Sequence, residues 1–152
     1  EELVAAAGQL DCGFKKMIYT RHFLRTLKPK VLAKITTHGL AIDGRALRSC
    51  SSFREFDDLY TAPFHGFENA DDYWSRASSK PWLKQIQVPT LMINARNDPF
   101  LPESALPTRE EVSGRVKLDF PGDGGHVGFV TGAFPGRLEW LPRRVLHFFT
   151  GD

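Results

Sequence analysis

The chain has 152 residues, of which 41% are hydrophobic and 25% are charged, and its formal net charge at pH 7 is +2. This composition is typical of a soluble globular domain. No apolar run approaches the roughly 20 residues that span a bilayer, so we expect no stable insertion into a membrane. The two cysteines, Cys12 and Cys50, have no metal-ligand spacing. The two could pair, but two thiols in a chain of this size are more often free and buried, which favours a reducing compartment and a cytoplasmic location.

Basic residues gather near the start of the chain, where no acidic residue occurs between Gly13 and Ile42. They are Lys15, Lys16, Arg21, Arg25, Lys28, Lys30 and Lys34. Such a run forms either a solvated helix face or a surface that meets phosphates or an acidic partner. The low net charge and the absence of a nucleic-acid-binding motif favour the solvated face, so we expect no nucleic acid as a partner.

Residues 1–80 have helical patterns and no convincing strand. In FKKMIYTRHFLRTL, apolar side chains recur at near-helical spacing; Pro29 interrupts this pattern, and VLAKI resumes it. The segment SSFREFDDLYTAP predicts a helix that serines cap and that Pro63 ends. The segment NADDYWSRASS predicts a further short helix with Asn69 as its cap.

Residues 81–152 have a different pattern, in which strands predominate. The short apolar run in VPTLMINARNDP and the alternating RVKLDF each predict a strand. Between them, PESALPTREEV predicts a broken helix or a long turn. The last segment, LEWLPRRVLHFFT, predicts a terminal helix that starts at Pro142 or is kinked by it. This order predicts an α/β protein with a parallel βαβ unit.

Two chemically active side chains follow the two predicted strands. Asp98 comes just after the first strand and His126 just after the second. Because the carboxyl ends of neighbouring parallel strands share one edge, we expect the carboxylate and the imidazole to meet there. The carboxylate would accept the Nδ1 proton and leave Nε2 as a base. The surrounding glycines, at 122, 124, 125 and 128, would let the loop bend sharply and present His126 at this edge.

Simpler interpretations stand beside this one. Asp98, which precedes a proline, fits a turn residue whose carboxylate binds its own backbone, Asn97 fits the left-handed residue of such a turn, and His126 fits an ordinary loop histidine. Should Asp98 have only a structural role, Asp119 and Asp123 are the next candidates for the acid. The histidines have no metal-site spacing, and the glycines do not form a nucleotide-binding motif, so we expect no metal and no cofactor.

At these residues the sequence resembles the α/β-hydrolase superfamily and, more narrowly, its YheT-like esterase branch. IQVPTLMINARNDPF matches the strand that delivers the family's acid, and GGHVGFV matches its histidine loop. FREFDDLYTAPFHGFENADDYWSRASS matches the cap region. The resemblance implies the C-terminal part of an α/β-hydrolase fold, with a helical cap at 1–80 and, at 81–152, the last two parallel strands and the terminal helix of the core.

The resemblance also implies residue roles. Asp98 would be the acid and His126 the base of a Ser-Asp-His triad that cleaves small-molecule or lipid-like carboxylic esters. Family members often have acids at both 97 and 98; the asparagine at 97 leaves Asp98 as the candidate. His65, together with Phe64 and Phe67, would line an acyl pocket in the cap.

The nucleophile of such a triad is missing from the chain. It normally stands in G-x-S-x-G on a sharp strand-to-helix turn, upstream of the acid. No serine has this context among Ser49, Ser51, Ser52, Ser75, Ser78, Ser79, Ser104 and Ser113. We therefore expect an N-terminal half that carries the serine and completes the sheet. The alternative function is a non-catalytic pseudo-hydrolase or fragment that binds an acidic partner through the basic residues of 15–34.

Overall fold

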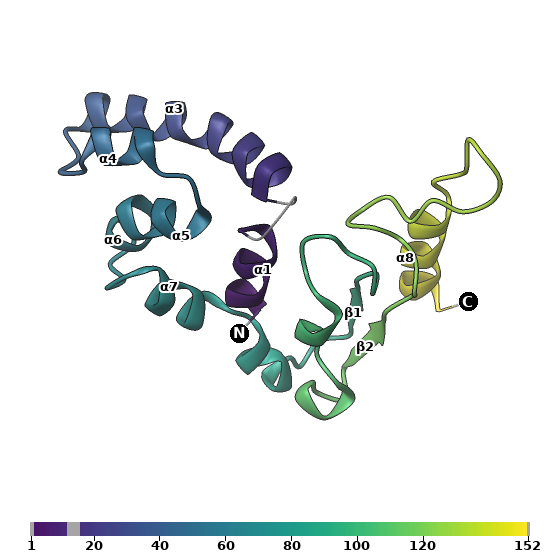
Figure 1. The fold of residues 1–152 in the computed structure, drawn as a ribbon. Helices are drawn as coiled ribbons and strands as arrows, with labels where there is room; N and C mark the ends of the chain where they lie inside the picture. Colours follow the sequence, from purple (N-terminus) through teal and green to yellow (C-terminus); the bar gives the residue numbers. More distant parts are fainter. Residues whose placement is uncertain (1, 12–15, 152) are drawn as a thin grey trace. The chain divides into compact units, whose positions relative to one another are not determined.

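The computed structural model describes residues 2–11 and 16–151, so Cys12 and Lys15 lie outside the described residues. The chain divides into two compact units, residues 1–78 and residues 79–152. All the regular structure described in the first unit is helical, whereas the second unit contains two strands (Figure 1). Helices together with a parallel pair of strands make this an α/β protein, as the sequence predicted.

The first unit is a series of mostly short helices. They are α1 (Glu2–Leu10), the π-helical turn η1 (Lys16–Thr20), α3 (Arg21–His38), α4 (Gly44–Ser49), α5 (Phe53–Phe56), the π-helical turn η2 (Asp57–Thr61), α6 (Ala62–Phe64) and α7 (Ala70–Ala77). In the described part of the chain, no helix is both long enough and apolar enough to cross a membrane.

Side-chain caps begin three of these helices. The Ser52 hydroxyl accepts a hydrogen bond from the Glu55 amide at 3.2 Å, and Asn69 Oδ1 accepts one from the Asp72 amide at 2.9 Å. Both caps confirm the sequence prediction. Asp43 caps α4, which the sequence analysis did not predict, by accepting from the Arg45 amide at 2.8 Å. Each cap satisfies an amide that lacks a partner within its helix.

The prediction that Pro29 interrupts the helical pattern is wrong, because α3 runs through it from Arg21 to His38. A proline inside a helix removes one backbone hydrogen bond and strains the preceding turn. Leu24 and Val31, on either side of Pro29, are both buried in the same core cluster. Tertiary packing of one apolar face therefore outweighs the local break, as it does for most helices in proteins.

Buried apolar side chains from several helices form the core of the first unit. The main cluster consists of Leu24, Val31, Leu47, Cys50, Phe56 and Tyr60. Cys50 is a free thiol in this cluster, and burial raises its pKa. The Lys28 ammonium donates to the carbonyls of Arg48, at 2.9 Å, and Cys50, where α4 ends. Lys28 therefore binds within its own unit.

Asp57 joins two helical segments of this unit. Its carboxylate accepts hydrogen bonds from the Thr61 hydroxyl at 2.6 Å and from the indole N–H of the buried Trp74 at 2.8 Å. Burial raises the pKa of this carboxyl above its usual range. The folded state thus holds the Asp57 proton more tightly than the unfolded state does. The free energy of unfolding should fall as pH rises through the Asp57 pKa.

Replacing Asp57 by Ala is expected to lower the free energy of unfolding by about 1–3 kcal/mol, because the Trp74 N–H loses its acceptor inside the protein. The control is Asp57→Asn, whose amide oxygen still accepts from Trp74, and we expect it to cost clearly less. It should also remove the Asp57 contribution to the pH dependence. Urea denaturation at several pH values measures both effects. Equal losses in the two variants would contradict the assigned hydrogen bond.

The second unit is built on two short parallel strands, β1 (Thr90–Ile93) and β2 (Val116–Asp119). Their register pairs Thr90 with Val116 and Ile93 with Asp119. The remaining elements are the 3₁₀ turns η3 (Lys80–Gln85), η4 (Glu103–Ala105) and η5 (Arg109–Glu111) and the terminal helix α8 (Trp140–Thr150). Pro142 lies in the first turn of α8, where a proline is tolerated.

The connection between the strands contains no α-helix, although the pattern of the sequence predicted a βαβ unit. Only η4 and η5 interrupt it, which fits the alternative of a broken helix or long turn. Pro102 and Pro107 bracket η4, and proline disfavours a helical residue before it. A helix across this connection is therefore prevented locally.

The apolar core of the second unit packs against the sheet, and β1 faces α8. The buried residues Leu83, Val112 and Val116 form the core, with Met92 and Leu118 packed against it. An apolar hollow of about 280 Å³ lies between β1 and α8 and is lined by residues that include Leu91 and Phe148. Every residue of β1 is only half-buried, unlike a central strand of a parallel sheet, which is covered on both faces.

Candidate active site

The loops that follow β1 and β2 leave the sheet side by side. Beyond the strands, the Asn94 amide donates to the Asp119 carbonyl at 3.3 Å, and the Arg96 amide donates to the Pro121 carbonyl at 2.9 Å. The two segments that follow β1 and β2 thus stay paired for several residues past the sheet. This pairing brings the segments that contain Asp98 and His126 to the same edge.

Asp98 binds on both of its oxygens. Oδ1 accepts hydrogen bonds from the amides of Phe100 at 2.7 Å and Leu101 at 3.4 Å, while Oδ2 lies 2.9 Å from His126 Nδ1. Its side chain is 0% exposed. Asp98 is therefore a turn residue and a histidine partner at once. The two interpretations of the sequence do not compete, because each uses a different oxygen.

His126 presents one nitrogen to the carboxylate and leaves the other accessible. An ionised carboxylate only accepts hydrogen bonds, so the contact with Asp98 places the proton on Nδ1 and the lone pair on Nε2. The His126 side chain is 51% exposed. The edge-to-face contact with the Phe100 ring, 4.6 Å between centroids, fixes the tilt of the imidazole. The arrangement can accept a proton at Nε2 and stabilise the resulting imidazolium.

Close packing at Gly124 shapes the histidine loop. A Cβ atom there would lie 2.6 Å from the Phe129 ring and 2.8 Å from Ala95 Cβ, and only glycine avoids this contact. The Phe129 amide donates to the Gly124 carbonyl at 2.8 Å and closes the loop around His126. Phe129 has a φ of 44°, which costs a non-glycine residue roughly 1–2 kcal/mol. Its burial, with the ring stacked on Trp140 at 5.0 Å, offsets that cost.

The glycines of this loop have unequal roles. Gly125 has a φ of +63°, in the left-handed region that favours glycine. Gly122 and Gly128 have no positive φ, and a Cβ at either would meet nothing closer than ordinary contact distance. The expectation that all four glycines shape the loop is therefore wrong for Gly122 and Gly128.

Asn97 has a function in this site that the sequence analysis missed. The positive-φ positions among the described residues do not include Asn97, so it is not the left-handed residue of the turn. Its side chain instead crosses to the histidine loop. Oδ1 accepts from the amides of Gly124 at 3.0 Å and Gly125 at 2.9 Å, and Nδ2 donates to Asp123 Oδ1 at 3.1 Å.

The two reserve candidates for the acid bind other partners. Asp123 is held by Asn97, and the Asp119 carboxylate forms an ion pair with Arg144 on α8. Neither contact involves His126. Among the carboxylates at this edge, the structure brings Asp98 to the imidazole.

Among the described residues, no serine stands on a turn that leads directly from a strand into a helix, which is the usual place of a triad nucleophile. All eight serines lie in the described residues, and none directly follows β1 or β2. Ser113 donates to the Ile86 carbonyl at 2.6 Å, before the amino end of β2 and thus at the edge opposite His126. Phe64, His65 and Phe67 belong to the first unit, where the Phe64 ring contacts Tyr60 at 5.2 Å.

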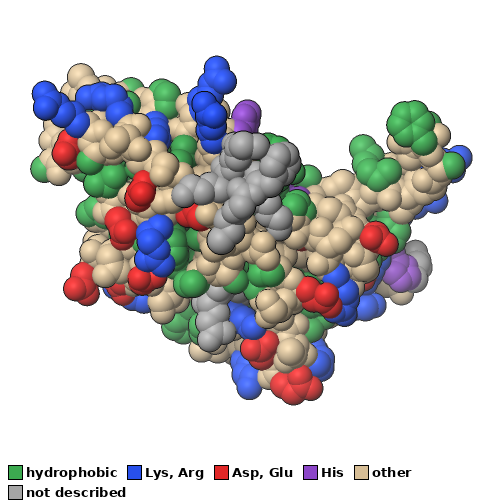
Figure 2. All heavy atoms as spheres, in the orientation of Figure 1, with side chains coloured by type: hydrophobic (Ala, Val, Ile, Leu, Met, Phe, Trp, Pro, Cys, Tyr) green, Lys and Arg blue, Asp and Glu red, His purple; other side chains and the backbone are tan. Residues whose placement is uncertain are grey.

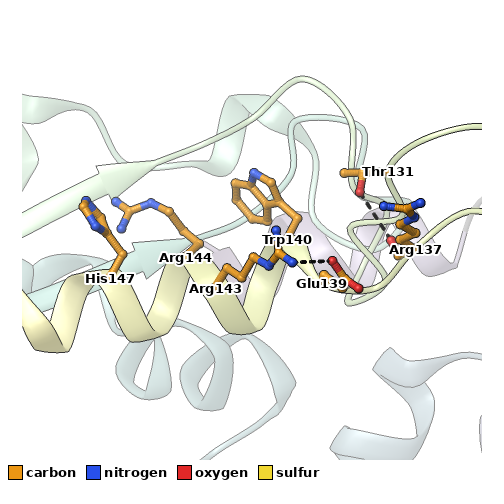
Figure 3. Close-up of a pocket in the computed structure, with 7 residues that line it drawn as sticks. All are labelled: Thr131, Arg137, Glu139, Trp140, Arg143, Arg144 and His147. Atoms are coloured by element: carbon orange, nitrogen blue, oxygen red, sulfur yellow. Dashed lines mark hydrogen bonds and ion pairs between the residues drawn. The ribbon is translucent and has the colours of Figure 1, made fainter. Parts of the chain in front are cut away.

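A hollow of about 420 Å³ lies along α8 and does not include His126 (Figure 3). It is lined by Thr131, Arg137, Glu139, Trp140, Arg143, Arg144 and His147. Two of its arginines already have acidic partners, since Arg143 binds Glu139 at 2.7 Å and Arg144 binds Asp119. We assign it no ligand for this reason. In the part of the chain that the structure describes, no three His, Cys, Asp or Glu side chains gather as metal ligands.

Comparison with known proteins yields several relatives with hydrolase names. The chain is 35% identical over 150 residues to "Putative esterase YheT" of Escherichia coli (strain K12), which covers 97% of this chain and 44% of that protein. It is 33% identical over 108 residues to human "Phospholipase ABHD3", covering 70% of this chain and 26% of that protein. For human "Monoacylglycerol lipase ABHD2" the identity is 32% over 107 residues, covering 67% and 25%. Neither a family model nor a solved structure matches the chain.

These similarities show that the chain belongs to the α/β-hydrolase superfamily. Within that superfamily, the similarity to YheT extends over nearly the whole chain. The chain spans less than half the length of each of these three relatives.

Proposed function

We propose that this chain is the C-terminal part of a serine hydrolase that cleaves carboxylic esters, with Asp98 as the acid and His126 as the base of its triad. The hydrogen bond of 2.9 Å between Asp98 Oδ2 and His126 Nδ1 carries the proposal. It supplies the geometry in which a carboxylate fixes the imidazole tautomer that can accept a proton. The hydrolase names of the relatives support the same reaction class.

In the proposed mechanism, a serine from an N-terminal half attacks the ester carbonyl. His126 Nε2 takes the serine proton and then gives it to the leaving alcohol, and Asp98 stabilises the imidazolium between the two steps. Water then attacks the acyl-enzyme with the same base, which releases the acid and regenerates the serine. Backbone amides of the N-terminal half would hold the developing oxyanion.

The N-terminal half would also complete the sheet. The described sheet has two strands, and β1 is only half-buried along its length. A strand with an unpaired edge exposes backbone donors and acceptors to other chains. We propose that another strand pairs with β1, that residues 81–152 form the end of the hydrolase core, and that residues 1–80 form its helical cap segment.

The proposed substrates are small-molecule or lipid-like carboxylic esters. The names of two relatives specify a phospholipase and a monoacylglycerol lipase, both of which act on lipids. Comparing turnover of short-chain and long-chain p-nitrophenyl esters by the full-length protein would test the preference.

The 152-residue chain alone is expected to show no ester hydrolysis and no labelling by a serine-directed phosphonate, because none of its serines has the sequence context of a nucleophile elbow. The full-length protein should hydrolyse esters and react with the phosphonate, with the label on a serine upstream of Glu1. Mass spectrometry of the labelled peptides distinguishes the two. Stoichiometric labelling of any of the eight serines in this chain would overturn the proposed location of the nucleophile.

The second candidate function is that of a non-catalytic protein that binds an acidic partner through the basic residues of 15–34. Arg21, Arg25 and Lys30 support it, since all three are exposed on α3. Figure 2 shows Lys and Arg side chains along the outer edge of the α3 and α4 region. Lys28, however, donates to backbone carbonyls of its own unit, and the exposed Lys34 contacts the Tyr60 hydroxyl at 3.5 Å. Salt-sensitive binding of an acidic polymer, together with no hydrolysis by the full-length protein, would favour this function.

A further inference from the structure

The Asn97 side chain ties the acid turn to the histidine loop at three points. It accepts from the Gly124 and Gly125 amides and donates to the Asp123 carboxylate, with all three distances between 2.9 and 3.1 Å. Gly125 immediately precedes His126, and Asn97 immediately precedes Asp98. Asn97 and Asp98 therefore both hold the histidine loop. Asn97 binds its backbone amides, and Asp98 binds the His126 imidazole.

The chemistry of its partners fixes which way the Asn97 amide points. Backbone amides only donate hydrogen bonds, and an ionised carboxylate only accepts them. The carbonyl oxygen must therefore face the two glycines and the NH₂ group must face Asp123. An aspartate at this position would keep the acceptor and lose the donor. It would also place a second carboxylate against Asp123, where the like charges repel.

We propose that Asn97 is a positioning residue for the candidate base. By holding the backbone just before His126, it sets where the imidazole stands relative to Asp98 and directs Nε2 toward the reacting serine. This inference rests on the proposed function of the pair. The contact between Asp98 and His126 aligns the ring only if the loop backbone stays in place, and the His126 side chain itself is 51% exposed.

The test uses the full-length protein and two independent readouts: kcat and KM for a p-nitrophenyl ester, and hydrogen exchange of the peptide that spans residues 121–130. Asn97→Ala should lower kcat about tenfold or more with little change in KM, since a small misplacement of a catalytic group is costly. The same variant should expose the two amides that Asn97 now binds, and the peptide should gain deuterium early.

Exchanging the two partners provides a sharper comparison. Asn97→Asp alone should impair both readouts, because it removes the donor and adds repulsion. The double variant Asn97→Asp/Asp123→Asn restores one carboxylate and one amide in swapped positions, and it should recover most of the activity and the protection. Asn94→Ala is the matched control; the Asn94 side chain donates to the adjacent Ala95 carbonyl at 2.9 Å, and neither readout should change.

Each result decides the proposal. Unchanged hydrogen exchange of the 121–130 peptide in Asn97→Ala would show that Asn97 does not hold the histidine loop, whatever the activity. Raised hydrogen exchange with unchanged kcat would show that Asn97 holds the loop but does not position His126 for catalysis. Failure of the double variant to recover over Asn97→Asp would overturn the assigned pairing. A full-length protein without hydrolysis would overturn the proposed function, and the exchange data would still decide whether Asn97 holds the loop.

Discussion

Asp98→Asn in the full-length protein is expected to lower kcat for ester hydrolysis by about 10⁴, the loss that follows the equivalent change in a serine protease. The reason lies in the two oxygens of Asp98. The Phe100 and Leu101 amides need an acceptor at Oδ1, so the asparagine oxygen should occupy that position. Its NH₂ group would then face His126 Nδ1 and would force the proton onto Nε2. The base would be lost while the turn stays intact.

Retention of the turn makes this variant informative. The thermal midpoint should change little, because the asparagine still accepts from both backbone amides. The control is Asp71→Asn, an exposed carboxylate that pairs with Arg54 in the first unit, and it should leave turnover nearly unchanged. If Asp98→Asn kept more than roughly a tenth of wild-type turnover, far above the loss expected for a triad acid, Asp98 would be a structural turn residue.

Gly124→Ala should produce the second largest effect. The new methyl group would lie within 3 Å of both the Phe129 ring and Ala95, and neither belongs to a flexible side-chain end. Overpacking of this kind costs about 1–3 kcal/mol in the free energy of unfolding. Any relief would move the loop that carries His126, so turnover should fall about 10²-fold. Urea denaturation and steady-state kinetics of the full-length protein measure the two losses.

Gly122→Ala is the matched control for this change. It lies in the same loop, has no positive φ, and has open space where its Cβ would stand. We expect it to affect neither stability nor turnover. Similar losses in the two variants would show that the loop needs glycines for flexibility and would contradict the packing explanation.

The sequence predicted those features that depend on short-range patterns. Ser52 and Asn69 cap helices because their side chains reach amides only three residues away. The meeting of Asp98 and His126 followed from a general property of parallel strands, whose carboxyl ends share an edge. In each case a local rule or a rule of topology was enough.

Features that depend on distant packing could not be predicted in this way. The continuity of α3 through Pro29 depends on a core that three later elements, α4, α5 and η2, help to build. The special position of Gly124 depends on Phe129 and Ala95, and the Asn97 contacts require the loops to be placed in three dimensions. The adjacency of Asn97 to Asp98 was visible in the sequence, but nothing in the pattern showed where its amide would point.

The contacts that hold the acid and the base come from a short part of the chain. Asp98 binds Phe100, Leu101 and His126, and Asn97 binds the three residues before His126. These ties all lie between positions 97 and 126. Insertions before β1, or after Trp140 whose ring stacks on Phe129, would therefore leave these hydrogen bonds untouched. The flanking segments could therefore change, in evolution or by design, to suit a new substrate while the proton-transfer pair is retained.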